Sequence, residues 1–380
     1  MLFTFLLYLF LATIVAYSWW QFGNWRQWQN IQERQSALSS EQPYISVLVP
    51  FRNEAENLPA LLAALRAQTY PSFGVIFIDD HSSDSGPAIL GAAAGAEQGL
   101  SMSLLSLAEL PWVETLVAHK KAALALGIEQ SEAEIIFTTD ADCYLPPDLL
   151  ARVAAAFTPT VEVVLGPVFN APVAGFCQYF QALDLAAYQF LTAISLNNGT
   201  PTLANGACLA FRKGSFNRVG GYVGVEHLPS GDDVLLLHKF RQVLPAAAFT
   251  WLPKGPPVDT LPVKGWRALW RQRLRWAGKA GHYQARELDY AQALSFLASF
   301  ALLALLPLCL HLRTAAPLLL AWGMKLTVDW LCLRDIIQFY EREFLLRWYL
   351  PTALLYPFFL VSIGTATLLG FKASWKGRKT

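Results

Sequence analysis

The sequence is poor in charged residues. They make up 15% of the 380 positions, whereas a typical soluble domain has about a quarter. Hydrophobic residues reach 54%, and the net charge is only +1. No run of lysine and arginine is dense enough to follow a phosphate backbone. The composition therefore predicts that part of the chain lies in lipid, and it argues against a nucleic-acid partner.

The sequence also lacks the patterns of disulfide and zinc proteins. Its 5 cysteines are odd in number, widely scattered and without C-x-x-C spacing. Neither a disulfide framework nor a zinc site is predicted, and the thiols are expected to be packed in a reducing compartment. His119, His227 and His238 lack the spacing of metal ligands and are interpreted as ordinary polar residues.

A long uncharged run lies near the amino terminus. Residues 2–20 carry no charge, and their number matches the ~20 residues that a helix needs to cross a bilayer core. A cleaved signal peptide is the rival interpretation, but no basic residue precedes the run and no A-x-A site is present. Tryptophans that suit a membrane interface follow, and Arg26 and Arg34 then place the next part of the chain in the cytoplasm.

Three further apolar segments lie near the carboxyl terminus, at residues 291–312, 315–333 and 349–370. The second contains Lys325 and Asp329, whose i, i+4 spacing predicts a structural ion pair inside a helical bundle, with a role in transport as the alternative. Three spans would leave the basic tail FKASWKGRKT outside, against the positive-inside rule. Either one segment is re-entrant or interfacial, or the rule fails in this chain.

The middle of the chain has the pattern of a soluble α/β domain. Short β-branched runs alternate with helical patterns, which predicts a mostly parallel sheet with helices on both faces. The expected strands are residues 44–50, 74–80, 101–107 and 134–140, and expected helices include 57–68 and 120–130. Ligands bind such sheets at the carboxyl ends of the strands. Polar residues stand at three of these ends, so they are expected to converge on one edge.

The fourth strand ends in two carboxylates one residue apart, Asp140 and Asp142. Close carboxylates repel each other unless a cation lies between them. An all-oxygen setting without neighbouring His suits Mg²⁺ or Mn²⁺ rather than zinc. The pair is therefore predicted to hold a divalent cation with open positions for substrate phosphates.

Seven segments together resemble one family. In order, they are ISVLVPFRNEAENL, VIFIDDHSSD, HKKAALALGI, IIFTTDADC, NGACLAFRKGSFNRVGGY, SGDDVLLLHKF and QRLRW. With these segments the chain resembles the membrane-bound family 2 glycosyltransferases, which have a Rossmann-like GT-A nucleotide-sugar domain. The last segment fits Q-x-x-R-W, a signature of cellulose, chitin and hyaluronan synthases and, in variant form, of ceramide glucosyltransferases. The early and late apolar segments fit the layout of that group.

The resemblance implies roles for residues on the donor side. Asp80 resembles the aspartate that contacts the nucleotide base, with Asp79 beside it, and Asp142 resembles the metal ligand, with Asp140 supporting it from the ribose side. The remaining donor-binding residues implied by the resemblance are Pro50, Arg52, Glu54, Lys120 and Arg275. Here His119 stands where the family has a glycine before the lysine, and Lys121 is a second candidate for that lysine.

An inverting transfer also needs a base for the acceptor hydroxyl. Asp232 and Asp233 precede an amphipathic pattern and resemble the family's acidic pair, so Asp233 is predicted to be the base. For Asp232, a helix-capping role and a catalytic role remain equally open. Asn205 and Gly206 are expected on the acceptor side, where they let backbone approach the sugar.

The segment KGWRALWRQRLRWAGKAGHY, residues 264–283, interleaves tryptophans with arginines. As a helix it would lie on a membrane surface. The resemblance adds that Arg275 meets the donor diphosphate, and that Gln272 and Trp276 lie on the acceptor side. Both interpretations are compatible.

The predicted organisation is a membrane-flanked α/β GT-A domain. The segments are a transmembrane helix at 1–22, a linker at 23–42, the GT-A domain at 43–258, an interfacial segment at 259–288, about three transmembrane segments at 289–371 and a basic tail at 372–380. The predicted activity is a metal-dependent inverting hexosyl transfer from a nucleotide-sugar, most simply a UDP-sugar, to a lipid or saccharide. It would occur at the cytosolic face of a membrane, such as a bacterial inner membrane.

Three alternatives stay open. A processive polysaccharide synthase shares Q-x-x-R-W, although such enzymes usually have more spans than this sequence offers. A polyprenyl-phosphate sugar transferase shares the donor domain but usually lacks that motif. An inactive membrane subunit that binds or exports sugars is the non-enzyme alternative, which the retained Asp80, Asp142 and Asp233 argue against.

Overall fold

The structure is a computed structural model that divides the chain into two compact units. The sheet unit comprises residues 35–171 and 195–261, and the helical unit comprises residues 1–34, 172–194 and 262–380. The structure describes residues 1–31, 41–95, 99–109, 118–252, 254–371, 374–375 and 378–379. Residues 32–40 of the predicted linker 23–42, and residues 372, 373, 376, 377 and 380 of the predicted tail 372–380, therefore lie outside the described residues.

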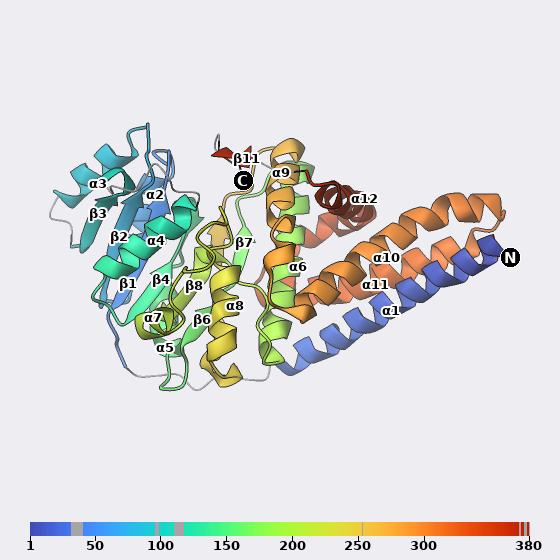
Figure 1. Cartoon of the computed structure of the whole chain (residues 1–380), viewed down its shortest axis with the longest axis horizontal. Helices are drawn as coiled ribbons and strands as arrows, with labels where there is room; N and C mark the ends of the chain where they lie inside the picture. Colours follow the sequence, from blue (N-terminus) through green and yellow to red (C-terminus); the bar gives the residue numbers. More distant parts are fainter. Residues whose placement is uncertain are drawn as a thin grey trace. The chain divides into compact units, whose positions relative to one another are not determined.

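The sheet unit is built on a seven-stranded sheet with the strand order β3-β2-β1-β4-β8-β6-β9 (Figure 1). Its first four strands are parallel neighbours, and their β-branched residues are buried in the core. These strands are β1 (Ile45–Phe51), β2 (Phe73–Asp79), β3 (Met102–Ser106) and β4 (Ile135–Thr138). The connecting helices are α2 (Leu58–Arg66), α3 (Gly86–Ala94) and α4 (His119–Gln130), with the short η1 (Leu107–Glu109) after β3.

The second half of the sheet unit reverses direction. Strand β8 (Leu209–Arg212) pairs antiparallel with β4, and β6 (Val163–Leu165) pairs antiparallel with β8 and parallel with β9 (Phe249–Trp251). A small sheet joins β5 (Cys143–Tyr144), β10 (Val258–Thr260) and β7 (Val168–Asn170). The remaining helices are α5 (Leu149–Ala156), η3 (Gly206–Cys208), α7 (Lys213–Arg218), α8 (Val234–Val243) and η4 (Ala246–Ala248). The mostly parallel α/β sheet is confirmed.

The helical unit contains the long apolar helices. These helices are α1 (Leu2–Ile31), α10 (Arg286–His311), α11 (Ala316–Phe339) and α12 (Tyr349–Leu368), the last preceded by η6 (Glu343–Trp348). Within the part of the chain that the structure describes, four helical stretches are long and apolar enough to cross a membrane: α1, α10, α11 and the segment Glu343–Leu368. The predicted Lys325–Asp329 ion pair forms, and the Tyr17 hydroxyl donates to Asp329 at 2.7 Å.

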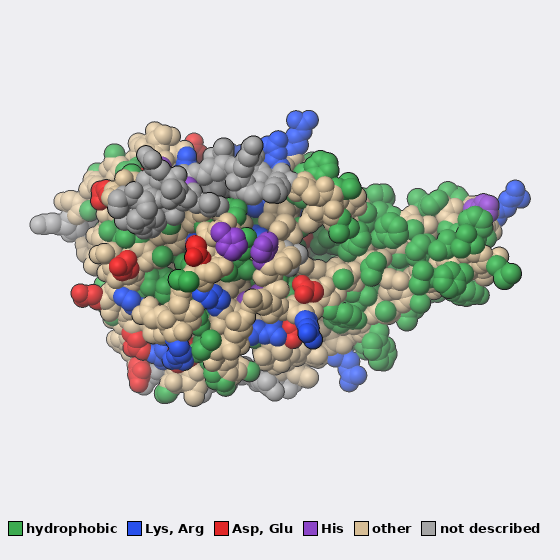
Figure 2. Space-filling view, viewed as in Figure 1, with side chains coloured by type: hydrophobic (Ala, Val, Ile, Leu, Met, Phe, Trp, Pro, Cys, Tyr) green, Lys and Arg blue, Asp and Glu red, His purple; other side chains and the backbone are tan. Residues whose placement is uncertain are grey.

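The surface of α1, α10 and α11 is largely hydrophobic (Figure 2). Phe5 is 64% exposed, Leu310 is 72% exposed and Leu319 is 69% exposed. Burial of apolar surface is favourable by roughly 25 cal/mol per Å², so an aqueous surface of this kind would be unstable. The helices α6 (Gly175–Asn197) and α9 (Trp266–Ala277) lie beside this bundle in the same unit, with η5 (Ala280–His282) and the hairpin β11 (Ser374–Trp375) and β12 (Arg378–Lys379) completing the elements.

Candidate active site

The acidic residues predicted at the ends of strands lie at or just after the carboxyl ends of β1, β2 and β4. Asp79 is the last residue of β2 and is in register with Phe51 at the end of β1. The next residue, Asp80, donates its backbone N–H to the Phe51 carbonyl at 2.9 Å. Because β4 pairs with the other side of β1, the strand ends that carry the predicted donor and metal residues converge on one edge of the sheet.

The loops after β1 and β2 are tied to each other. The Asn53 side chain accepts a hydrogen bond from the Ser83 backbone N–H at 2.7 Å, and the Asp84 carboxylate accepts one from the Ala55 backbone N–H at 2.8 Å. Asn53 has a φ of 53°, a left-handed conformation that asparagine tolerates better than most residues. These bonds fix the backbone that carries Arg52 and Glu54.

Two histidines meet the carboxylate of Asp80. His81 Nδ1 lies 3.0 Å from Asp80 Oδ1, and His119 Nδ1 lies 2.9 Å from the same oxygen. The three side chains could together offer ligand atoms to a metal ion. The start of α4 brings His119 against the end of β2, a contact that the sequence interpretation of His119 as an ordinary polar residue did not include.

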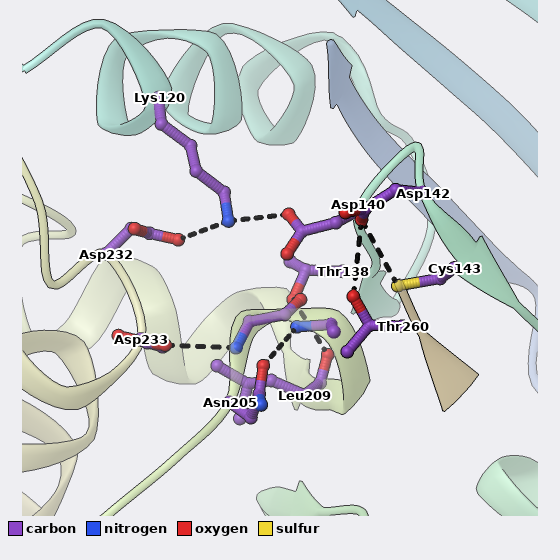
Figure 3. Close-up of polar contacts among 12 residues, drawn as sticks. Lys120, Thr138, Asp140, Asp142, Cys143, Asn205, Leu209, Asp232, Asp233 and Thr260 are labelled. Atoms are coloured by element: carbon purple, nitrogen blue, oxygen red, sulfur yellow. Dashed lines mark hydrogen bonds and ion pairs between the residues drawn. The ribbon is translucent and has the colours of Figure 1, made fainter. Parts of the chain in front are cut away.

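Lys120 joins two carboxylates across the site (Figure 3). Its Nζ lies 2.7 Å from Asp140 Oδ1 and 3.1 Å from Asp232 Oδ2. Burial favours the neutral amine, but the negative charges of Asp140 and Asp232 outweigh it and hold the pKa of Lys120 well above its usual value. Lys120 is therefore a permanent cation between the residues after β4 and those before α8. Lys121, the second lysine candidate, instead donates to backbone carbonyls, including that of Leu228 at 2.7 Å.

Asp142 lies in a strongly acidic environment. Burial, together with the carboxylates of Asp140 and Glu54, raises the pKa of Asp142 to about 7. Its Oδ1 accepts a weak hydrogen bond from the Thr260 hydroxyl at 3.5 Å. A carboxyl group that holds its proton to neutral pH beside two other carboxylates fits the oxygen-rich donor set that Mg²⁺ and Mn²⁺ require.

The structure separates the two acids of the Asp232–Asp233 pair. Asp233 is the residue that caps α8, because its Oδ1 accepts from the Val234 backbone N–H at 2.7 Å. Its Oδ2 accepts from the Gly206 N–H at 3.1 Å. Asp232 is 7% exposed and pairs with Lys120. The capping role that the sequence left open for Asp232 thus belongs to Asp233.

Asn205 and Gly206 lie between the Asp232–Asp233 pair and strand β4. The Asn205 side chain accepts from the Ala207 N–H at 3.0 Å, and the Gly206 carbonyl accepts from the Thr138 hydroxyl at 2.8 Å. A Cβ atom at Gly206 would lie 3.1 Å from Asp232 Oδ2 and 3.3 Å from Lys120 Nζ. A side chain at this position would therefore require the charged ends of Asp232 and Lys120 to shift by a few tenths of an ångström.

The Q-x-x-R-W residues lie on α9, in the helical unit. Between them, Arg273 forms a buried ion pair with Asp184 of α6, with Nε 2.6 Å from Oδ2. Its Nη1 donates to Gln272 Oε1 at 2.6 Å, and its Cζ lies 4.1 Å from the centre of the Trp276 ring. The side chains of Gln272 and Trp276 are thus both held by Arg273, whereas Arg275 and Trp276 are half-buried.

The sequence reasoning missed His81, Asp184 and Arg273 as members of these clusters. His81 directly follows the Asp79–Asp80 pair, so its position after a strand end was a usable signal. Asp184 sits in an apolar helix, where a lone carboxylate demands a partner. Its partner, Arg273, is 89 residues away, and no local pattern identifies it.

Known proteins resemble this chain in sequence and in fold. An undecaprenyl-phosphate 4-deoxy-4-formamido-L-arabinose transferase from Pseudomonas fluorescens is 31% identical over 133 residues, which cover 33% of this chain and 36% of the relative. The glycosyltransferase AglE of Haloferax volcanii is 31% identical over 134 residues, covering 34% of this chain and 41% of that protein. These matches thus span less than half of either relative.

A solved mannosyltransferase from Pyrobaculum calidifontis, in complex with GDP-Man and Mn²⁺, has the same fold. It superposes with a TM-score of 0.58 at 20% identity, covering 95% of this chain and 99% of that chain. The predicted GT-A-like α/β fold flanked by candidate membrane helices is confirmed.

The model of glycosyl transferase family 21 matches residues 6–380. The sequence resemblance had indicated glycosyltransferase family 2. The family model confirms that the chain is a glycosyltransferase but assigns it to a different family. The grouping with cellulose, chitin and hyaluronan synthases stays a prediction. Because the match spans nearly the whole sequence, the chain belongs to glycosyl transferase family 21.

Proposed function

We propose that this enzyme is a membrane-integrated inverting glycosyltransferase. It transfers a sugar from a nucleotide-sugar, most simply a UDP-sugar, to a lipid or saccharide acceptor at the cytosolic face. The observation that carries this proposal is the charged row running from Asp142 through Asp140 and Lys120 to Asp232. This row supports the proposal because it lies at the carboxyl-end edge of an α/β sheet, where ligands of such sheets bind, so that Asp140 and Asp142 would hold the cation and Asp232 and Asp233 would face the acceptor.

The donor half of the site comprises Asp80, Asp140 and Asp142. Asp80, oriented by two imidazoles, would accept a hydrogen bond from the nucleotide base. Asp142 and Asp140 would hold Mn²⁺ or Mg²⁺. A bound cation of this type neutralises the charge that grows on the leaving nucleoside diphosphate. Lys120 offers a second positive charge close to the same carboxylates.

The acceptor half comprises Asp232 and Asp233. In the transfer, the acceptor oxygen forms a bond to the anomeric carbon as the bond to the diphosphate oxygen breaks, and the electron pair leaves with the nucleoside diphosphate. The acceptor proton passes to Asp233, for which such assistance is worth roughly 10²–10⁴-fold. Two backbone N–H groups already donate to Asp233, and because a carboxylate is a weak base for a hydroxyl group, proton transfer would accompany bond cleavage rather than precede it.

Transfer to a polyprenyl phosphate is the second candidate. Curated relatives named as undecaprenyl-phosphate sugar transferases favour it. Their similarity covers about a third of the chain, and Q-x-x-R-W argues for another acceptor. An assay that offers purified enzyme a polyprenyl phosphate and a neutral lipid side by side separates the two candidates.

Two conservative variants test the separate roles proposed for Asp142 in cation binding and for Asp233 in proton transfer. Asp142→Asn should abolish cation-dependent donor binding, whereas Asp233→Asn should keep donor binding and lose turnover by at least about a hundredfold. Glu134→Gln is the matched control, because Glu134 is a carboxylate of the same unit whose side chain is 60% exposed. Near-normal turnover in Asp233→Asn would move the base to Asp232.

A further inference from the structure

The last long apolar helix, α12, raises a problem of topology. Its composition and length suit a membrane span. If it crossed, however, the tail that follows, with Lys372, Lys376, Arg378 and Lys379, would lie across the membrane from the sheet unit. That placement contradicts the tendency of basic flanks to stay on the cytoplasmic side.

The three-helix bundle of α1, α10 and α11 provides a scale of depth. Helices α1 and α10 run antiparallel, since Phe10 meets Phe300 and Trp20 meets Tyr290. Helices α1 and α11 run parallel, as contacts between Tyr17 and Asp329 and between Trp25 and Asp335 show. On this scale Ile14 of α1 lies level with about Phe296 of α10 and about Leu326 of α11, by the constant rise of a helix.

Both ends of α12 lie at that same level. At its start, the Tyr349 hydroxyl donates to the Leu326 carbonyl, and the Tyr349 ring lies 5.0 Å from that of Trp330. Near its end, Gly364 packs directly against the Phe296 ring. Between Tyr349 and Gly364 the helix advances about 22 Å without changing depth. Figure 1 agrees, because α12 is seen nearly end-on while α1, α10 and α11 run in the plane of the picture.

The depth itself fits a helix that lies in one leaflet. Ile14 precedes Trp20 by six residues, or about 9 Å along the helix. Trp20 belongs to the group of tryptophans, with Trp19, Trp25 and Trp28, that is typical of an interface. Helices that lie in the plane of a membrane bury their apolar faces about 5–10 Å below the headgroups.

The two faces of α12 differ as an in-plane helix requires. On one face, Leu350, Leu354 and Phe358 are 55%, 43% and 54% exposed and are spaced four residues apart. The other face packs on α9, where Ile363 contacts Leu274 and the Trp270 indole donates to the Ser362 hydroxyl at 3.2 Å. Because the sequence of α12 contains no charged residue, its outer face suits acyl chains rather than headgroups or water.

We propose that α12 lies in the plane of the leaflet on the side from which the chain leaves α1 for the sheet unit. The chain then crosses the membrane three times, through α1, α10 and α11. The exposed face of α12 is a lipid-binding surface of the acyl region of that leaflet. The basic tail lies on the same side as the sheet unit, which removes the conflict with the charge rule.

Spin-label depth measurements in nanodiscs of phosphatidylethanolamine and phosphatidylglycerol test the orientation. Nitroxides on the full chain at Leu350, Phe358 and Leu368, each substituted by cysteine in a Cys177→Ser background, should have equal depths within about one helical turn. Cys177 is the native thiol that is not buried. Labels at the exposed α11 positions Leu319, Thr327 and Gln338 are the control and should differ steadily in depth. A steady change along α12, spanning about 27 Å, would overturn the proposal.

The side of the tail is tested independently in the same background. A cysteine at Thr380 should react with a membrane-impermeant maleimide from the same side as Glu132→Cys on the sheet unit. It should react from the side opposite to Ala315→Cys in the turn between α10 and α11. Glu132 and Ala315 are both exposed. Labelling at Thr380 from the Ala315 side would show that α12 crosses the membrane, and the proposal would fail.

Discussion

One ammonium group joins the two halves of the candidate active site: Lys120 Nζ lies 2.7 Å from Asp140 and 3.1 Å from Asp232. Asp140 follows strand β4, at the edge where the donor-binding residues are predicted, and Asp232 lies just before helix α8, which Asp233 caps. A single side chain therefore sets the separation between the group that would hold the donor's cation and the group that would meet the acceptor. Lys120 therefore both neutralises these two carboxylates and fixes the distance between them.

Removing the charge of Lys120 should damage both stability and activity. Lys120→Met leaves the buried Asp232 beside Asp140 without its cation, and breaking a buried pair in this way costs about 3–5 kcal/mol. Because the Lys120 side chain is 29% exposed, the lower end of that range or less is expected. Lys120→Arg keeps the charge and should retain more of the melting temperature. Equal melting temperatures in wild type and Lys120→Met would refute the coupling.

Adding one methyl group at Gly206 should displace the same ammonium group. The new Cβ would lie 3.1 Å from Asp232 Oδ2 and 3.3 Å from Lys120 Nζ, so both groups must shift by a few tenths of an ångström. Misplaced charges at a reacting centre can cost on the order of a hundredfold in rate. We expect Gly206→Ala to lose turnover while staying folded. Gly214→Ala is the matched control, because a Cβ atom there meets nothing within 4 Å.

Cation binding should depend on pH through Asp142. Its pKa is raised to about 7 by burial and by the carboxylates of Asp140 and Glu54, so below that pH a metal ion must displace a proton. Apparent Mn²⁺ affinity should fall about tenfold for each pH unit below 7. Isothermal titration between pH 5.5 and 8.5 measures this slope. A flat profile would place the cation elsewhere, for instance at the Asp80–His81–His119 cluster.

The same group predicts a stability change in the metal-free protein. The folded state holds the Asp142 proton up to about pH 7, whereas the unfolded chain releases it near its ordinary value, about 3.9. The contribution of this group to folding therefore decreases as the pH rises from about 4 to 7. Asp142→Asn should raise the melting temperature of metal-free protein at pH 8 but change it little at pH 4. A drop at pH 8 would contradict the sign of the shift.

The buried pair of Arg273 and Asp184 should position the Q-x-x-R-W tryptophan. The Arg273 guanidinium, clamped by Asp184 at 2.6 Å, lies 4.1 Å from the Trp276 ring. Asp184→Asn should lower the melting temperature and raise the acceptor KM more than the donor KM. Arg271→Gln is the control, because Arg271 is an exposed arginine of the same helix. An unchanged acceptor KM in a folded Asp184→Asn variant would assign the pair a purely structural role.

Much of the fold was predictable because its signals are local. The short apolar runs placed β1 to β4 within a few residues of their observed bounds. The rule that parallel sheets bind ligands at the carboxyl ends of their strands predicted that Asp80 and Asp142 lie at one edge. The i, i+4 spacing of Lys325 and Asp329 was enough to predict their ion pair. Each of these inferences depends on spacing within one element.

The remainder depends on contacts between distant segments. His119 reaches Asp80 across 39 positions, and Asp184 reaches Arg273 across 89, so local spacing does not reveal either pair. Hydropathy likewise shows that α12 is apolar, but it does not show the direction of the helix relative to the bundle. That direction is set by the packing of α12 on α9 and α10. The choice between Asp232 and Asp233 as the cap of α8 also required the backbone geometry of Asp233.

The most direct test of the account is donor binding and turnover by the purified protein of the sequence shown. UDP-, GDP- and dTDP-sugars would be offered with and without Mn²⁺ or Mg²⁺, to wild type and to Asp142→Asn. The account predicts cation-dependent binding and cleavage of one nucleotide class, a UDP-sugar in the simplest case, and loss of both in Asp142→Asn. Cation-independent cleavage that persists in Asp142→Asn would contradict the assigned site.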